Sequence, residues 1–312
     1  MRADLVSVLR CPVCADGLQL ADRTARCGQG HAYDLAKQGY LNLLPSASNG
    51  IEGDSAEMVE ARSVFLAQGW YEPIRDALIE SLPPITSAAP LVAEVGAGTA
   101  YYLAGVLEAG NKTQLPDLHR GQVVADPERR KEGEIAGYLE TSGQQPGWRG
   151  IAVDVSRYAA RRAAKVDAGI GSVVGDAWQE LPVRDGVADV VLDVFAPRNA
   201  GEMARVLAPG GTLLVVTPNQ AHLGELIDVL GMVSVDGEKE RRLVESLAGF
   251  DRVEQRVVET TMRLDHGAIE QLVGMTPSAR HVDKQARAER IGVLADPMDV
   301  TLSVTVSSWR TA

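Results

Sequence analysis

Short apolar runs alternate with segments of helical periodicity through most of the chain. The helical segments lie at about residues 100–107, 157–166 and 199–207. Apolar strands separated by helices are typical of a parallel sheet that helices cover on both faces. The predicted strands are residues 91–95, 150–154, 172–174, 190–194 and 212–217, and later 250–264 and 300–307. The pattern therefore predicts an α/β fold with a doubly wound sheet and a late pair of strands.

The first predicted strand runs into a glycine turn, Glu94-Val95-Gly96-Ala97-Gly98-Thr99. Glycines without side chains allow a sharp turn and a close approach to a ligand. The helix that follows points its N-terminus at the same place. The next strand ends at Asp154, where a carboxylate usually binds ribose hydroxyls in such sheets. A G-x-G turn alone is weak evidence, but with Asp154 it predicts a nucleotide-like ligand.

Two later strand ends extend this candidate site. Asp176 follows the third strand, where a carboxylate can accept from an adenine amino group, although a simple turn aspartate has the same position. The fourth strand ends in Val194-Phe195-Ala196-Pro197. Active residues of open parallel sheets lie beyond the carboxyl ends of the strands. Phe195 and Pro197 are therefore candidates for the floor of a base-sized pocket.

Two segments flank the first strand and its helix. Residues 46–89 predict a polar linker and two helices, the first with capping-box spacing at Asp54 and Glu57 and the second with Pro73 in its first turn. Arg62 and Arg75 on these helices either face a substrate or are solvated or paired on the surface. Residues 109–149 are rich in Gly, Pro, Gln and charge. They predict a surface insertion on the cofactor side that serves as a lid, an RNA contact or an idle loop.

Bulk composition narrows the class of protein. The chain has 312 residues, 45% of them apolar, and a formal net charge of -11. A net negative charge does not favour nonspecific binding of polyanions, so a nucleic-acid partner would have to bind at local basic patches. No apolar run approaches the length of a membrane span, and charged residues interrupt the N-terminus where a signal peptide would be apolar. We expect a cytoplasmic protein with no membrane partner.

All three cysteines fall in one motif, Cys11-x2-Cys14-x12-Cys27-x3-His31. Two close pairs of soft or borderline ligands, with no carboxylate among them, are typical of tetrahedral structural zinc. The alternative is three buried thiols and an exposed histidine. Four protein ligands leave no open position for catalysis. The motif predicts a small zinc ribbon that the metal stabilises.

The stretch from Lys37 to Leu44 mixes basic, amide and aromatic groups beside this motif. Such groups stack on unpaired bases and bind phosphate. Alternatively, Tyr33, Tyr40 and Leu43 pack the ribbon onto the next domain. The spacing leaves both interpretations open.

Together these motifs resemble the zinc-containing 23S rRNA (guanine-N1-)-methyltransferases, especially the RlmA(II), or tylosin-resistance, type. The helix, Pro209-Gly210-Gly211 turn and strand at 199–217 also resemble the late part of class I S-adenosylmethionine-dependent methyltransferases. The resemblance covers nearly the whole chain except the insertion. The segments that carry it are the Cys/His set, 37–44, 94–99, 154–156, 194–199, 216–223, 261–266 and 300–305.

The resemblance implies a Rossmann-like class I methyltransferase with a seven-stranded sheet. Residues 1–45 are then a zinc ribbon that recognises RNA, residues 46–89 a linker with a helical pair, and residues 90–312 the methyltransferase domain. The implied reaction moves a methyl group from S-adenosylmethionine to N1 of a guanine in the hairpin 35 region of 23S rRNA. The family also implies a homodimer and, in this branch, resistance to tylosin-like macrolides. Ala100 departs from the pattern, because a third glycine is common there.

These interpretations define the expected site. Guanine N1 carries a proton at neutral pH, so transfer needs a base or a path to solvent. Asp193 and His222 are candidates for that base, although each can instead be structural. The expected catalytic residues are Asp193, Phe195, Pro197 and His222. The expected cofactor contacts are Glu94, Gly96, Ala97, Gly98, Thr99, Tyr102, Asp154, Val155, Asp176 and Ala177. The alternatives are a small-molecule methyltransferase, which the acidic charge favours slightly, and a non-catalytic cofactor- or RNA-binding module.

Overall fold

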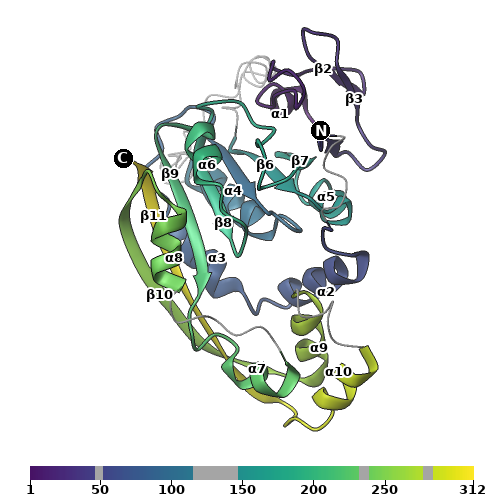
Figure 1. Ribbon diagram of the computed structural model, residues 1–312, viewed down its shortest axis with the longest axis vertical. Helices are drawn as coiled ribbons and strands as arrows, with labels where there is room; N and C mark the ends of the chain where they lie inside the picture. The colour runs from purple at the N-terminus through teal and green to yellow at the C-terminus, as the bar shows by residue number, and fades with distance from the viewer. Residues whose placement is uncertain (46–51, 115–146, 232–238, 277–283) are drawn as a thin grey trace, which may run out of the picture.

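The computed structural model describes residues 1–45, 52–114, 147–231, 239–276 and 284–312. A small N-terminal unit lies against one edge of a large sheet, and a long pair of strands extends from the opposite edge (Figure 1). The predicted linker residues 46–51 and most of the predicted insertion, residues 115–146, lie outside the described part of the chain.

The N-terminal unit is a three-stranded antiparallel sheet beside one helical turn. Its elements are α1 (Ala3–Val6), β1 (Gln19–Ala21), β2 (Thr24–Arg26) and β3 (Ala32–Asp34). Strands this short bury little on their own, so the unit shares its core with the large sheet. Leu5 and Leu9 are fully buried in the same cluster as Val153 and Val183.

The large sheet has the strand order β10-β11-β9-β8-β5-β6-β7-β4. Neighbours from β9 to β4 run parallel, while β11 is antiparallel to both β9 and β10. The strands are β4 (Leu41–Asn42), β5 (Leu91–Val95), β6 (Arg149–Asp154), β7 (Ile170–Val174), β8 (Ala188–Val194), β9 (Leu207–Pro218), β10 (Phe250–Leu264) and β11 (Met298–Thr311). Seven of these eight strands match the predicted sheet.

The eighth strand, β4, settles the role of the stretch after the ribbon's sheet. Leu41 pairs with Val173 and Asn42 with Val174, and Leu43 is buried. The apolar residues of this stretch therefore pack the ribbon onto the sheet, whereas Lys37 is exposed. The packing interpretation is confirmed for Leu43, while RNA contact through the exposed Lys37 stays a prediction.

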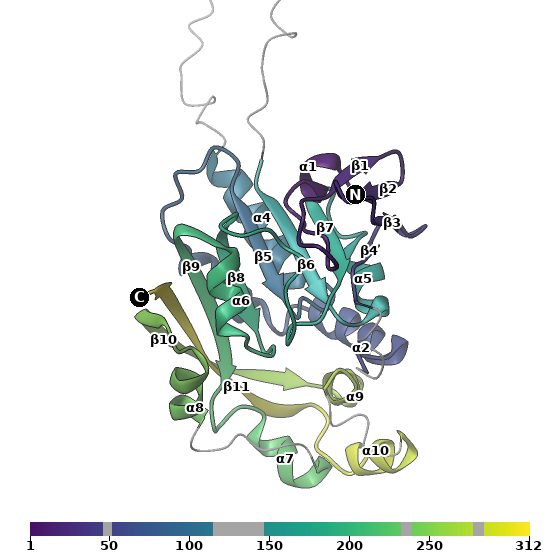
Figure 2. The ribbon, with the colours of Figure 1, turned by 45° about the horizontal axis from the view of Figure 1, so that its top comes forward.

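Helices cover both faces of the sheet (Figure 2). One buried cluster joins the sheet to α2 (Ala56–Ala67), α3 (Glu72–Glu80), α4 (Tyr101–Gln114), α7 (Gly224–Leu230) and α9 (His266–Gly274). The other cluster joins the opposite face to the ribbon, α6 (Ala200–Val206) and α8 (Lys239–Ser246). Because both faces of the sheet are covered, the side chains on both faces of each central strand are buried, and these strands are apolar throughout.

The strands β10 and β11 run beyond the rest of the sheet and form an arm. β11 pairs with β9 only from Val304 to Trp309, but with β10 from Met298 to Thr311. The helices α7, α9 and α10 (Lys284–Ile291) cluster around the far end of this arm (Figure 2). The helix α9 also packs on α2. The arm therefore faces the carboxyl ends of β5 and β8 across the helical pair.

Three local expectations were wrong. The helix after the glycine turn continues to Gln114 instead of ending near Leu107. The first helix of the pair begins after Ser55, which accepts from the Met58 amide, so Ser55 replaces Asp54 as the N-cap. The insertion joins the fold at the end of α4 and the start of β6, which is the amino edge of the strands and not the cofactor side.

Both described ends of the insertion are pinned at that amino edge. The Trp148 amide donates to Asn111 Oδ1 at 2.8 Å, and the Trp148 ring fills the space where Gly110 lacks a side chain. Among the described residues, no helix is long and apolar enough to cross a membrane.

Candidate active site and zinc site

The glycine turn after β5 is built from alternating left-handed residues. The φ angles of Gly96, Gly98 and Ala100 are 65°, 53° and 59°. The Ala97 amide donates to the Val153 carbonyl at 3.0 Å, which ties the turn to the neighbouring strand. A Cβ on Gly96 would lie 2.6 Å from Ala196 Cβ, so only glycine fits there. The turn thereby brings the end of β5 against the end of β8.

Asp154 and Asp176 lie at the carboxyl ends of β6 and β7, as the sequence predicted. Asp154 accepts from the Gly98 amide at 2.7 Å and from the Ser156 amide at 2.8 Å, which orients its carboxylate beside the turn. Asp176 accepts from the Trp178 amide through Oδ1. Its other oxygen, Oδ2, is buried without a partner among the described residues. Val155 and Ala177 are half-buried next to these two aspartates.

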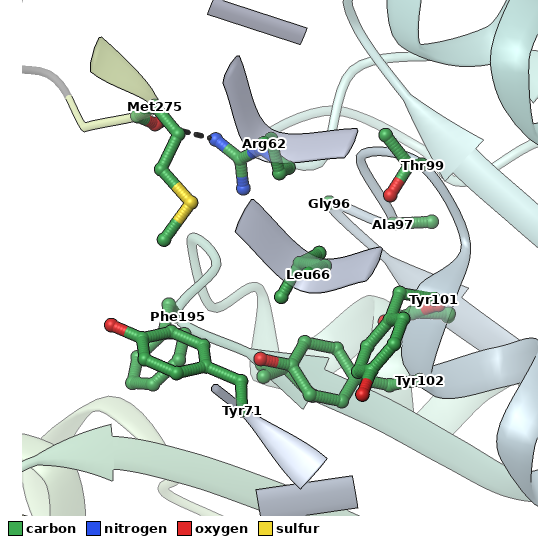
Figure 3. A pocket seen from close by; sticks show the side chains of 12 residues that line it. Arg62, Leu66, Tyr71, Gly96, Ala97, Thr99, Tyr101, Tyr102, Phe195 and Met275 are labelled. Atoms are coloured by element: carbon green, nitrogen blue, oxygen red, sulfur yellow. Dashed lines mark hydrogen bonds between the residues drawn. The ribbon is translucent and has the colours of Figure 1, made fainter. Parts of the chain in front are cut away.

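A pocket opens beside the glycine turn (Figure 3). It contains five of the predicted cofactor residues, Glu94, Gly96, Ala97, Thr99 and Tyr102, and the predicted catalytic residue Phe195. Val194 and Tyr101 also line it, from the strand end and the helix that the sequence already placed there. The sequence did not place Leu66, Tyr71 and Met275 at the turn, and it left open whether Arg62 faces a substrate.

Phe195 is held in an unusual conformation at the end of β8. Its φ is 56°, a left-handed value that costs energy in a bulky side chain and is concentrated at functional sites. Its ring is 39% exposed although it lines the pocket. Pro197 follows in the segment that touches the glycine turn. The strand end therefore presents an aromatic face to the pocket instead of burying it.

Two further rings surround Phe195. The His222 ring stacks on it with centroids 6.0 Å apart and an interplanar angle of 19°. The buried Tyr71 ring lies 6.3 Å from Phe195 and 6.2 Å from His222. These three residues come from β8, the loop before α7 and the segment before α3. The structure therefore brings Phe195 and His222 together as predicted and adds Tyr71.

A hydrogen bond indicates which ring nitrogen of His222 carries the proton. Its Nδ1 accepts from the Ser303 amide at 3.3 Å. A neutral ring that accepts at Nδ1 carries its proton on Nε2, as inferred from this bond. This arrangement favours a donor role for His222 over the role of a base.

Asp193 lies on the other face of the sheet from the pocket. Its neighbours Leu192 and Val194 point into the cluster beneath the pocket, whereas Asp193 alternates away from them and is fully buried. Burial raises the pKa of Asp193 to about 8. The Arg198 guanidinium, whose Nε lies 3.6 Å from Asp193 Oδ1, lowers this pKa but does not offset the effect of burial. The structure thus gives Asp193 affinity for a proton but does not place it among the residues that line the pocket.

Glu94 is the carboxylate of the pocket. It is buried beneath the turn and accepts from the Leu103 amide at 3.3 Å. Burial, with a contribution from the nearby charge of Asp154, raises the pKa of Glu94 to about 8. A bound cation would stabilise its ionised form.

The four predicted zinc ligands converge. The ligand atoms of Cys11, Cys14, Cys27 and His31 all lie within 4.8 Å of one another. His31 Nδ1 is 3.5 Å from Cys11 Sγ and 3.3 Å from Cys27 Sγ, and the Cys14 and Cys27 sulfurs are 3.6 Å apart. These separations match the edges of a tetrahedron around zinc. Three thiolates and an imidazole fit a closed structural zinc site.

Outer contacts prepare one of these thiols for a metal. The Tyr33 hydroxyl lies 3.1 Å from Cys11 Sγ, and the Val13 amide donates to the same sulfur. Burial raises the pKa of the Cys11 thiol, but these hydrogen bonds outweigh it and hold the pKa at about 6. A metal binds the thiolate, so a lowered pKa favours binding at neutral pH.

Comparison with known proteins matches both parts of this arrangement. Residues 9–49 match a zinc-ribbon family described as "RlmA, N-terminal". Over 313 residues the chain is 41% identical to the 23S rRNA (guanine(748)-N(1))-methyltransferase of Streptomyces fradiae, with 99% of each chain covered. The chain belongs to this family of zinc-ribbon 23S rRNA (guanine-N1-)-methyltransferases. The doubly wound sheet, the zinc-ribbon match with its converging ligands and the relative's activity agree with the predicted fold class, enzyme class and cofactors.

Other members of the family are also similar over their full length. A protein of Micromonospora griseorubida, provisionally named a 23S rRNA (guanine-N(1)-)-methyltransferase, is 38% identical, with 99% of each chain covered. A protein of Bacillus subtilis with the same provisional name is 27% identical, and the match covers 96% of this chain and 95% of that one.

The residues at the carboxyl edge fit S-adenosylmethionine. The unpartnered Asp176 Oδ2 suits the adenine amino group, and Asp154 beside the turn suits the ribose hydroxyls. Glu94 offers a negative charge for the α-amino group.

Proposed function

We propose that this enzyme transfers a methyl group from S-adenosylmethionine to N1 of a guanine in the hairpin 35 region of 23S rRNA. The target is the position that the Streptomyces fradiae relative's name gives as guanine 748. The observation that carries the proposal is the match over 99% of both chains, since it includes the ribbon, the helical pair, the sheet and the arm. Cofactor contacts from the ten predicted residues, and a base pocket at Phe195 and Pro197, are part of the proposal.

The target guanine stacks on Phe195 in this proposal. Its ring is exposed at the strand end next to the glycine turn, where the methyl donor binds. Base–aromatic stacking contributes about 1–3 kcal/mol and fixes the plane of the base. S-adenosylmethionine, when bound, supplies an electrophilic methyl group, so holding N1 in line with it provides much of the rate.

Loss of the N1 proton leaves negative charge that spreads onto O6 of the guanine. His222, whose ring stacks on Phe195, is the donor to that oxygen in this proposal. Such a donor stabilises charge as it develops. Asp193 is the other candidate base, and its carboxylate lies beside Arg198 and outside the pocket lining.

The ribbon provides RNA recognition in this proposal, and two copies of the chain form a cleft as a cytoplasmic homodimer. The exposed Lys37 lies beside the zinc site, and Arg157 and Arg161 lie exposed on α5 (Arg157–Ala163). Local basic groups of this kind compensate for the net charge of -11. Methylation at this position would confer resistance to tylosin-like macrolides.

The test is methyl transfer to unmodified 23S rRNA, and to its hairpin 35 fragment, with labelled donor. We expect label in both RNAs and a primer-extension stop at one guanine. Phe195→Leu should lower the rate about tenfold or more while the affinity for S-adenosylmethionine is retained. Val257→Ala, at an exposed apolar residue of β10, is the matched control and should leave the rate unchanged. Label on small molecules only would support the alternative function and overturn this one.

A further inference from the structure

Arg62 reaches the pocket from outside the methyltransferase sheet. It lies on α2, in the helical pair between the ribbon and β5, and its side chain points into the pocket (Figure 3). Its Cδ lies over the glycine turn, 3.3 Å from where a Cβ of Gly98 would be. The absence of a side chain at Gly98 is therefore what admits Arg62 to the turn.

The hydrogen bonds of Arg62 leave part of its guanidinium available. Nη2 donates to Asp54 Oδ2 at 2.6 Å and to the Met275 carbonyl at 2.9 Å. Nε is buried and has no acceptor among the described residues. Nη1 lies 3.6 Å from the position of the missing Gly98 Cβ. Arginine has five N–H donors, so donors remain beside the glycine turn for a ligand.

The charged residues that line the pocket complement a zwitterionic ligand. Among the described residues that line it, Arg62 is the only cation and Glu94 the only carboxylate. The methionine part of S-adenosylmethionine carries an α-ammonium and an α-carboxylate on one carbon. Both residues line the pocket, so the two protein charges complement the two ligand charges.

We propose that Arg62 binds the α-carboxylate of S-adenosylmethionine and links it to the C-terminal end of α9. The link is the hydrogen bond from the same guanidinium to Met275, at the C-cap of α9. The same guanidinium then contacts both the bound carboxylate and the end of α9. This inference rests on use of S-adenosylmethionine and is independent of which RNA is methylated.

Calorimetry without RNA tests the inference by removing each partner of the ion pair. The ligands are S-adenosylmethionine and its decarboxylated analogue, and the protein is the full chain with zinc. We expect the wild type to bind the analogue about tenfold to hundredfold more weakly than S-adenosylmethionine, the range typical of a charged hydrogen bond. In Arg62→Gln the difference between the two ligands should nearly vanish, and Arg62→Lys should restore part of it.

The matched control is Arg256→Gln, which removes an arginine that is also paired with one carboxylate, Glu80, but does not line the pocket. It should keep the full difference between the ligands. Equal affinity of the wild type for both ligands would overturn the inference, and this arm needs no variant to fold. A uniform loss for both ligands in Arg62→Gln would also overturn it. RNA methylation by the wild type is a separate readout, so its failure would count against the proposed function alone.

Discussion

The zinc ribbon and the cofactor edge achieve their geometry by opposite means. In the ribbon, four ligands from a span of 21 residues, Cys11 to His31, define the structure, and its three strands have three residues each. At the cofactor edge, residues from α2, the glycine turn, β8 and α9 converge on one pocket. The ribbon depends on a metal that it binds locally, whereas the pocket depends on the packing of the whole sheet.

This contrast explains where each part is sensitive. The ribbon's ligands are close in sequence, so loss of the metal should disorder it without dismantling the sheet. The pocket has no local framework, so a single misplaced backbone contact should disturb several of its residues together. The contrast can be tested at each of the two regions separately.

The largest effect should follow Gly96→Ala. The new Cβ would lie 2.6 Å from Ala196 Cβ in a backbone with φ of 65°. Overpacking and left-handed strain together should cost about 2–5 kcal/mol of unfolding free energy, measured by denaturant titration, and binding of S-adenosylmethionine should be lost. Gly186→Ala is the control, because Gly186 has the same φ but open space. Equal loss in both variants would show that backbone strain, and not the contact with β8, is responsible.

Zinc removal should separate the two regions. Chelation, or Cys27→Ser, should lower RNA methylation at least about tenfold, because the ribbon loses a ligand or its metal. Affinity for S-adenosylmethionine should change less than about twofold, because the sites are distant and do not share partners. Calorimetry and the methylation assay measure the two effects, and added zinc should restore the chelated wild type. Parallel loss of both activities would mean that the two regions are one cooperative unit.

The pH dependence of cofactor binding should report Glu94. Burial holds the proton on Glu94 up to about pH 8 in the free protein. The ligand's ammonium stabilises the carboxylate, so the complex binds fewer protons and affinity should rise with pH until about 8, by about tenfold per unit at most. In Glu94→Gln, binding should be weaker and this rise should disappear. A slope that persists in the variant would assign it to another group, such as Asp154.

The smallest effect should follow Ala100→Gly. Ala100 has a φ of 59° and is fully buried in the turn. Glycine relieves left-handed strain of about 1–2 kcal/mol but adds entropy to the unfolded chain, so we expect a net gain of at most about 1 kcal/mol. Thermal unfolding measures it. A clear destabilisation would show that the Ala100 methyl group supports the core more than its backbone is strained.

The sequence predicted site residues that lie within one motif or element, and it did not predict which residues from distant parts of the chain join them. Ligand spacing identified Cys11 and His31, and strand ends identified Asp154 and Phe195, because these signals lie within one motif or one element. No spacing connects Arg62 and Tyr71 with Met275, since the fold alone brings α2 and α9 together. The sequence offered Arg62 as a residue that could face a substrate, but could not distinguish this from a solvated or paired arginine. Tyr71 carried no such signal.

Two parts of the chain lie elsewhere than the sequence suggested. Asp193 was selected for its strand, but the alternation of side chains along β8 turns it to the face away from the pocket. The insertion was expected on the cofactor side of the sheet, after a helix ending near Leu107. Since α4 runs to Gln114, the chain has already returned to the amino edge of the sheet by then.

The most direct test of the proposed reaction is nucleoside mass spectrometry of 23S rRNA from cells with and without this protein. We predict N1-methylguanosine in the hairpin 35 fragment only when the wild-type protein is present, and its absence with Gly96→Ala. An unchanged amount of N1-methylguanosine in that fragment would contradict the proposed function.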